Sequence, residues 1–169
     1  ISNALRKDKD TIIIGKDELY NPETAKLAFD YAYKSFIQNM WSQSNSNIIV
    51  SKILELRNGN TESNTESVWF NYTNIMLTAL LNALVWLRDN AGYELTPKIV
   101  WDNIDKKQME LIINGEKYPE LPLEYKDSIQ KYFNELENIG TIDVYKSHGY
   151  IQHELINVFK EFGLRDWYL

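Results

Sequence analysis

The chain has 169 residues, of which 44% are hydrophobic and 13% are aromatic, so it has the size and composition of one globular domain with its own core. It contains no cysteine, which excludes a disulfide framework, a thiol nucleophile, a cysteine zinc site and an iron–sulfur cluster. The formal net charge of −6 disfavours tight non-specific binding to phosphate backbones, which requires many Lys and Arg contacts.

The first twenty residues differ in character from the rest. They lack the apolar segment of a signal peptide and do not start with Met, so we expect an excised domain. Residues 11–15, "TIIIG", form a β-branched run closed by glycine, the one stretch that predicts a strand. We therefore expect residues 1–20 to be a connector that precedes a helical body, residues 21–163.

Helix signals begin after this connector. Asn21, Pro22 and Glu23 are typical of an N-cap, a first helical position and a first turn, and they predict a helix over about 22–43. Its buried face is expected to consist of small, aromatic and sulfur-containing side chains: Ala25, Ala28, Phe29, Ala32, Phe36, Met40 and Trp41. A second helix is expected over 47–57, and residues 58–67, "NGNTESNTES", should form a solvated loop.

The stretch from about 66 to 91 has the strongest helical periodicity. One stripe contains mostly apolar residues: Trp69, Thr73, Met76, Leu80, Ala83, Leu84 and Leu87. Further apolar residues widen this stripe, and Gly92 is a natural terminator. The apolar run is interrupted by polar residues and falls short of the ~20 residues that a bilayer requires, so we expect a central buried helix with no membrane contact.

Shorter helices should follow. Thr96 and Pro97 predict a helix over 96–104, and the next helix should end at Gly115. Periodicity predicts two more helices, over 122–138 and 145–163. The expected fold is all-α, a single compact body of six or seven helices.

No sequence motif for a chemical reaction is present. Neither G-x-x-x-x-G-K-[ST] nor G-x-G-x-x-G occurs, so the chain should not bind ATP by itself. "HELIN" at 153–157 places Asn157 where the zinc motif H-E-x-x-H needs its second histidine. We predict no catalytic residue, no metal and no cofactor.

Two polar features of the sequence favour structural roles over functional ones. His148 shares a buried stripe with Ile151 and Leu155, which favours a packing histidine bonded to a backbone carbonyl or a tyrosine over a catalytic one. His153 lies about 140° away around the helix. Lys106 and Lys107 follow aspartates closely, so this basic cluster should be neutralised locally.

Two stretches in combination resemble a known family. Residues 79–105 and 147–163 resemble the all-α domain of type IV coupling proteins, in the branch that serves Dot/Icm secretion and IncI-type conjugation. The similarity rests on an "LVWLRD" pattern and an "HGY-x-Q" element. These fall on Leu84, Val85, Trp86, Leu87, Arg88, Asp89, His148, Gly149, Tyr150 and Gln152.

This resemblance implies a non-enzymatic domain that recognises a protein substrate or adaptor. The parent would be a hexameric, membrane-anchored ATPase on the cytoplasmic side of the bacterial inner membrane. Residues 1–20 would then connect the helical body to the missing motor domain of that ATPase. Two alternatives stay open: a helical domain that binds the transferred DNA or its relaxosome, and an unrecognised hydrolase. If the chain is the recognition domain, Gly149 would let a neighbour approach the last helix closely, while His148 and Tyr150 would fix the start of that helix.

Charge favours the protein partner. Residues 59–97 carry one Arg against four carboxylates, and residues 120–137 carry two Lys against five, a net charge of −3 in each segment. Helices of that sign repel phosphates and attract basic proteins. We therefore expect a protein partner, with DNA bound only weakly.

Overall fold

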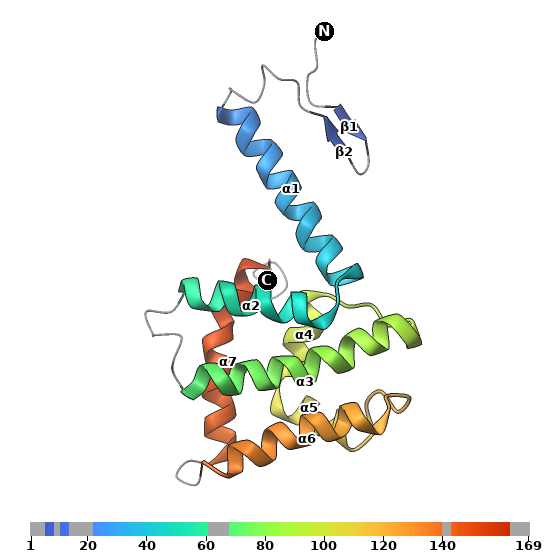
Figure 1. The fold of residues 1–169 in the computed structure, drawn as a ribbon, viewed down its shortest axis with the longest axis vertical. Helices are drawn as coiled ribbons and strands as arrows, with labels where there is room; N and C mark the ends of the chain where they lie inside the picture. The colour runs from blue at the N-terminus through green and yellow to red at the C-terminus, as the bar shows by residue number, and fades with distance from the viewer. Residues whose placement is uncertain (1–5, 9–10, 14–21, 61–67, 140–142, 163–169) are drawn as a thin grey trace. The chain divides into compact units, whose positions relative to one another are not determined.

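The structure is a computed structural model that describes residues 6–8, 11–13, 22–60, 68–139 and 143–162. These residues form an all-α protein with one small two-stranded ribbon (Figure 1). The elements are β1 (Arg6–Asp8), β2 (Thr11–Ile13), α1 (Pro22–Gln43), α2 (Ser46–Asn60), α3 (Val68–Ala91), α4 (Pro97–Ile104), α5 (Lys106–Ile113), α6 (Leu123–Glu137) and α7 (Val144–Glu161). The contacts divide the chain into two units, Ile1–Gln43 and Ser44–Leu169.

The first unit contains the ribbon and α1. β1 and β2 pair antiparallel, with Arg6 opposite Ile13. The predicted strand is present as β2, but its partner β1 was not predicted, because three consecutive charged residues give no strand signal. Gly15 lies outside the described residues.

Helix α1 has the predicted bounds but not the predicted burial. Met40 and Trp41 are buried, whereas Phe29 and Phe36 are 69% and 50% exposed. The ring of Phe29 stacks on Tyr33 at 6.4 Å between centroids. The expectation of a broad buried face over the whole helix was therefore wrong, because periodicity marks an apolar face without showing whether anything covers it.

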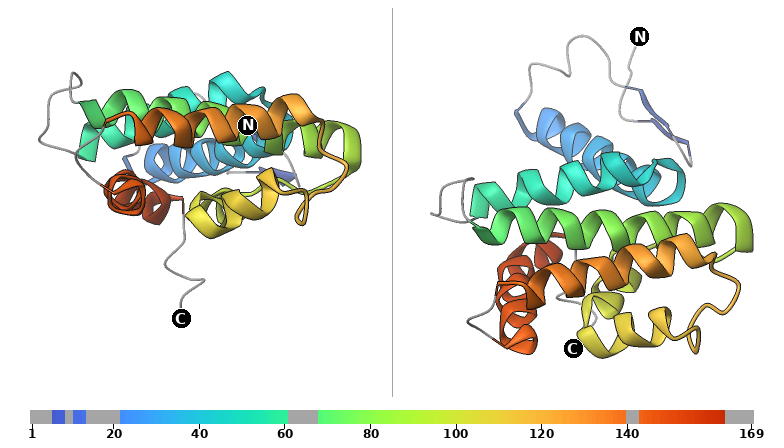
Figure 2. Two further views of the ribbon diagram at one scale, coloured as in Figure 1. Left: turned by 90° about the horizontal axis from the view of Figure 1, so that it is seen from below. Right: turned by 60° about the horizontal axis from the view of Figure 1, so that its bottom comes forward.

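The second unit is a two-layered helical body. Helices α2, α3 and α6 run side by side in one layer, and α4, α5 and α7 pack on one face of that layer (Figure 2). Helix α3 contacts α2, α4, α6 and α7, so its predicted central place is confirmed. The buried residues of α3 include all of the predicted stripe except Trp69, which is half-buried.

The ends of α2 and α3 differ from expectation only locally. Helix α2 continues through residues 58–60, which were predicted to be a loop, because α-helix tolerates Asn and Gly near a C-terminus. Residues 61–67 lie outside the described part of the chain. Helix α3, with 24 residues, is long and apolar enough to cross a membrane by length and composition, although a core helix has the same properties.

Capping accounts for the shorter helices. The Thr96 side chain accepts a hydrogen bond from the Ile99 amide at 3.2 Å and Pro97 begins α4, as predicted. Gly92 and Gly115 adopt φ values of 74° and 76°, the left-handed conformation that ends a helix.

Candidate functional site

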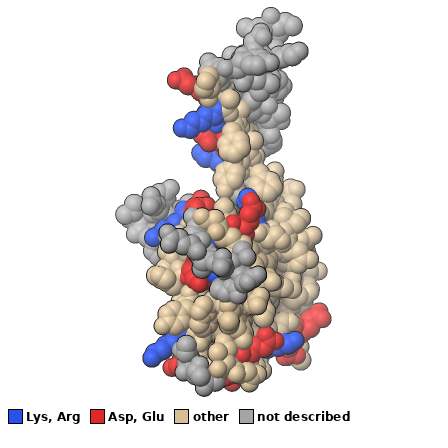
Figure 3. Space-filling view, turned by 60° about the vertical axis from the view of Figure 1, so that its left-hand side comes forward, with Lys and Arg blue, Asp and Glu red and all other residues tan. Residues whose placement is uncertain are grey.

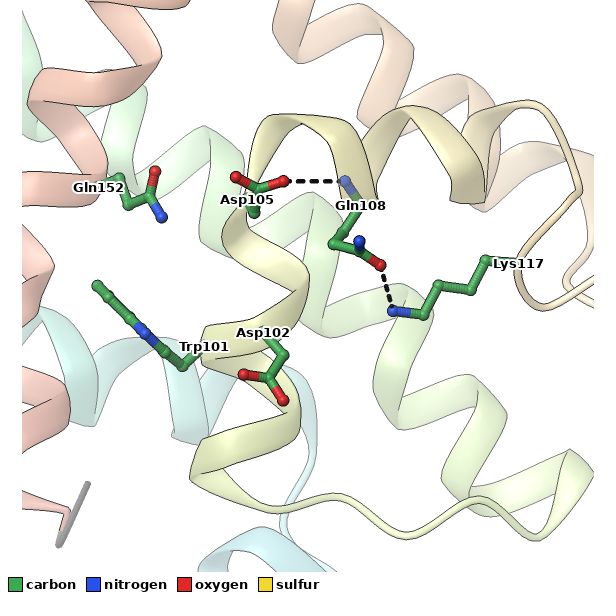
Figure 4. A pocket seen from close by; sticks show the side chains of 6 residues that line it. All are labelled: Trp101, Asp102, Asp105, Gln108, Lys117 and Gln152. Carbon is green, nitrogen blue, oxygen red and sulfur yellow. Dashed lines mark hydrogen bonds between the residues drawn. The ribbon is translucent and has the colours of Figure 1, made fainter. Parts of the chain in front are cut away.

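A polar groove of about 540 Å³ opens to solvent beside the corner between α4 and α5 (Figure 4). Its lining side chains come from α4, the corner, α5, the loop after α5, and α7: Trp101, Asp102, Asp105, Gln108, Lys117 and Gln152. Trp101, Asp102, Asp105 and Gln152 surround one open space in the close-up view, while Lys117 lies on the far side of Gln108. The groove therefore combines two carboxylates with an indole, two amides and one ammonium group.

Asp105 makes the corner. It ends α4 and begins α5, and its extended backbone (φ −54°, ψ 132°) breaks the helical path between them. Its side chain accepts hydrogen bonds from the amides of Lys107 at 3.0 Å and Gln108 at 3.3 Å. This N-cap holds the carboxylate at the positive end of the α5 dipole.

His148, a residue of α7, binds the end of α4 next to this corner. The side chain is buried, and its two ring nitrogens lie 2.7 Å from the Ile104 carbonyl oxygen and 2.7 Å from the Tyr132 hydroxyl. Burial lowers the pKa of His148, so the ring is neutral. Nε2–H therefore donates to Ile104, and Nδ1 accepts from Tyr132. The predicted packing histidine is confirmed, with both expected kinds of partner.

Gln152 follows His148 by about one helical turn and reaches the groove. The histidine thus fixes the backbone of Ile104 while the glutamine four residues later supplies a wall of the site. The "HGY-x-Q" element builds the groove through these two residues. This function of the element depends on an α4–α7 contact that periodicity along α7 cannot show.

The opposite wall is held by side-chain pairs. The Lys117 ammonium donates to the Gln108 side-chain oxygen at 2.9 Å, and burial lowers the pKa of Lys117 against the opposing effect of Asp102. Lys98 donates to Asp102 one turn along α4. The Trp101 ring packs on Phe159 of α7, with centroids 5.3 Å apart. These contacts orient the lining side chains before any ligand binds.

The other residues of the two family-like stretches lie elsewhere. Trp86 packs on Tyr125 of α6 with centroids 6.1 Å apart, Leu87 is buried, and Arg88 pairs with the adjacent Asp89 at 2.8 Å. Tyr150 contacts Trp69 at the start of α3, about 25 Å along that helix from Trp86. The residues of the "LVWLRD" pattern therefore lie outside the groove, whereas Trp101, Asp102 and Asp105 of the same stretch meet Gln152 of the other stretch there.

Gly149 was expected to give a neighbour close access. No neighbour among the described residues uses this access, because a Cβ placed there would meet none of their atoms within 4 Å. Tyr150 is 55% exposed and its ring lies 5.7 Å from that of Trp69, between centroids. The cap of α7 is Asp143, whose side chain accepts from the Tyr145 amide at 2.9 Å.

Sequence reasoning missed most of the groove. It considered Asp102 and Asp105 only as charges that balance Lys106 and Lys107. In the structure Lys106 instead pairs with Glu110, and its ammonium nitrogen lies 3.5 Å from the Tyr145 ring centroid. One signal in the sequence could have indicated the corner: Asp105 lies between two helical stretches, at a position typical of an N-cap. Over the described ranges, no group of three or more His, Asp or Glu side chains could hold a metal ion.

No protein-family model, no curated protein and no solved structure matches the chain.

Proposed function

We propose that this chain is a non-enzymatic domain that recognises a protein substrate or adaptor for a type IV secretion or conjugation coupling ATPase. The parent would be a hexameric, membrane-anchored protein, with this domain on the cytoplasmic side of the bacterial inner membrane. The resemblance of residues 79–105 and 147–163 supports the family. The groove beside the α4–α5 corner supports recognition as the role of the domain.

The groove carries the proposal because its chemistry suits a basic side chain. Asp102 and Asp105 offer carboxylates, and the Gln152 amide oxygen can accept a further hydrogen bond. Trp101 lies beside them, and indole is the best aromatic partner for a cation. A Lys or Arg side chain of a protein ligand would thus meet both charge and ring in one place.

The charges on the surface also favour a protein over a phosphate backbone. Figure 3 shows one face of the molecule. Over the described residues of this face, basic side chains are interspersed with acidic ones, and no broad basic area is seen. A phosphate-binding surface would need several Lys or Arg side chains on one face. The net charge of −6 agrees with this distinction.

Paired peptides test the proposed ligand. We expect a short arginine-containing peptide to bind the 169-residue chain and to shift the Trp101 indole resonance, whereas the same peptide with citrulline should not. Asp102→Lys should weaken binding about tenfold or more, since it replaces an attraction with a repulsion. Asp89→Lys is the matched control, because Asp89 is also an exposed aspartate paired with a neighbouring basic residue.

Equal binding of the two peptides, or equal effects of the two substitutions, would contradict the groove as the recognition site. The family assignment needs a separate test in the full-length protein. Deletion of this domain should stop transfer of its substrates while leaving ATP hydrolysis intact.

A further inference from the structure

Helix α1 carries large apolar side chains that face solvent along one side. Phe29 is 69% exposed, Phe36 is 50% exposed and Tyr33 is 37% exposed. Together with two alanines they recur at steps of three and four residues, which is the spacing of a coiled-coil seam. This α1 seam consists of Ala25, Phe29, Ala32, Tyr33 and Phe36. A continuous row of exposed aromatic side chains marks a contact surface.

The middle of the α1 seam is a flat aromatic surface. The rings of Phe29 and Tyr33 are stacked, with an angle of 11° between their planes. Stacking on each other leaves the other face of each ring open to a further apolar group. The seam is therefore ordered before any partner arrives.

All four charged side chains of α1 lie on one flank of the α1 seam. They are exposed, and at 100° per residue they fall about 60–140° around the helix from Phe29. Their signs alternate along the chain in the order Glu23, Lys26, Asp30 and Lys34. Figure 3 shows acidic and basic side chains alternating along one edge of α1. The other flank of the seam has small uncharged residues, Ala28 and Ser35.

This order of charges is complementary to its own reverse. In an antiparallel pair of α1 helices the charged flank of one helix faces the charged flank of the other. Lys26 then lies opposite Asp30 of the second copy, and Glu23 lies opposite Lys34 of the second copy. In a parallel pair the charged flank would face the uncharged one, and no ion pair would form. Charge complementarity therefore favours a second copy in the antiparallel direction.

The charges of α1 are not satisfied by pairing along their own helix. Lys26 and Asp30 are four residues apart, a spacing that permits an ion pair within a helix. The ion pairs among the described residues nevertheless do not include Lys26, Asp30 or Lys34. These three side chains can thus pair across an interface without giving up a partner in their own chain.

The apolar residues fit the same register. The midpoint of each proposed charge pair lies at residue 28 or just after it. A two-fold axis there places Ala25 opposite Ala32 of the second copy, and it brings the two Phe29 rings together beside the axis. Facing alanines let two helices approach closely, so the large rings can meet. Charge and apolar pattern therefore agree on one arrangement.

We propose that a second copy of this chain packs its α1 antiparallel against α1 along the α1 seam. The contact is isologous, so association ends at a dimer. A seam of about four helical turns is short, and we expect a dissociation constant between roughly 1 μM and 1 mM. This inference depends neither on the family assignment nor on the ligand proposed for the groove.

Sedimentation equilibrium of the 169-residue chain, from the micromolar to the millimolar range, tests the association. We expect a monomer–dimer equilibrium without larger species. Phe29→Asp should weaken it about tenfold or more, since it places a carboxylate in an apolar contact. Leu27→Asp is the matched control and should leave it unchanged. Leu27 is 52% exposed on the same helix but lies about 160° around it from Phe29.

Single cysteines determine the direction of the two helices, because the chain has no cysteine of its own. In the antiparallel pair the two copies of residue 25 lie about 10 Å apart along the axis, which is too far for a disulfide. Ala25→Cys alone and Ala32→Cys alone should therefore not cross-link on oxidation. An equimolar mixture of the two variants should give a disulfide-linked heterodimer. A parallel pair would give the reverse, with each variant cross-linked to itself.

Exchanging two charges tests the flank. Lys26→Glu should weaken the dimer, because the new carboxylate faces Asp30 of the second copy. Adding Asp30→Lys to the same chain should restore it, since the pairs form again with their signs reversed.

Several results would overturn the proposal. These are a parent chain that stays monomeric up to millimolar concentration, equal losses from Phe29→Asp and Leu27→Asp, self-cross-linking of each cysteine variant, and a charge exchange that fails to restore the dimer. Seam substitutions that lower the melting temperature of the second unit without changing association would also overturn it. The α1 seam would then pack within its own chain.

Discussion

His148 and Arg57 are two buried polar side chains that each join helices distant in sequence. His148 connects α7 with the end of α4 and with α6, and Arg57 connects α2 with Glu154 of α7. A buried polar group lowers stability unless its hydrogen bonds are made, so each side chain specifies which helices must meet. The bonded residues lie 16, 44 and 97 positions apart in the sequence, so only folding brings them together.

Protonation of His148 should destabilise the fold. Its pKa is lowered in the folded chain, mainly by burial, while an unfolded histidine titrates near 6.5. As pH falls below about 6.5, the unfolded state binds a proton first, so the free energy of unfolding should fall by up to ~1.4 kcal/mol per pH unit. Denaturant unfolding between pH 7.5 and pH 5.5 measures this slope.

His148→Gln should remove this contribution to the slope and should lower stability at pH 7.5, because it disrupts two buried hydrogen bonds. His153→Gln, at an exposed position of the same helix, serves as control and should leave the slope unchanged. An identical pH profile for His148→Gln and the parent chain would show that the histidine is not neutral and buried as described.

The ion pair of Arg57 should contribute far more than those on the surface. The guanidinium is fully buried and donates from Nε to Glu154 at 3.0 Å, while its carbon lies 5.3 Å above the Phe70 ring centroid. Glu154→Ala removes the carboxylate partner and should lower the free energy of unfolding by about 3 kcal/mol. Glu55→Ala, which removes an exposed partner of Lys52, should change it by less than about 0.5 kcal/mol. Equal losses in urea unfolding would contradict this ranking.

Among the elements, α3 shows the strongest agreement between pattern and packing. Helices surround it on several sides, and its apolar residues continue nearly all round, as expected for a helix with several neighbours. Helix α1 shows the opposite case. Its aromatic residues recur at helical spacing, yet Phe29 and Phe36 are exposed.

A carboxylate in the centre of α3 should prevent folding. Leu80 is fully buried and Leu84 is 4% exposed, so Leu80→Asp or Leu84→Asp would bury a charge among apolar side chains. We expect loss of the cooperative thermal transition in circular dichroism. Asn71→Asp places the same charge on an exposed position of α3 and should melt within about a degree or two of the parent, as expected for surface changes. A Leu84→Asp variant that melted like Asn71→Asp would place α3 outside the core.

For the whole molecule, the distribution of charge sets the choice of partner. The acidic segment 120–137 has mostly exposed carboxylates, whereas Lys106 is engaged by Glu110 and Tyr145. Burial opposes the charged form of Lys106, while its hydrogen bonds with these two residues raise its pKa. This lysine is therefore a cation with protein partners, which makes it less available to a phosphate.

Duplex DNA should bind poorly. We expect affinities no tighter than the ~10⁻⁴–10⁻⁶ M typical of non-specific binding at physiological salt, measured by fluorescence anisotropy with a labelled duplex. The arginine peptide described above should respond to Asp102→Lys, and DNA should not weaken with that substitution. Sub-micromolar affinity for DNA that disappears when Lys106 and Lys107 are reversed would favour the DNA-binding alternative.

The sequence by itself determined the all-α class, the seven helical segments and the central place of α3. These follow from local causes: the 3.6-residue period of apolar side chains, threonine and proline at a helix start, and glycine after a helix end. It also predicted the packing role of His148, because that residue falls on the apolar stripe of its own helix.

Only the tertiary structure decided the groove, the identity of the partners of His148, and the exposure of α1 and Gly149. The groove joins Asp102 and Asp105 with Gln152. The spacing of these residues along the chain does not show that they lie close together in the fold. Periodicity reports which side of a helix is apolar, but burial depends on what packs there, and that is a property of the whole fold. For this physical reason Gly149, which appeared to mark a contact within the chain, instead marks an open surface.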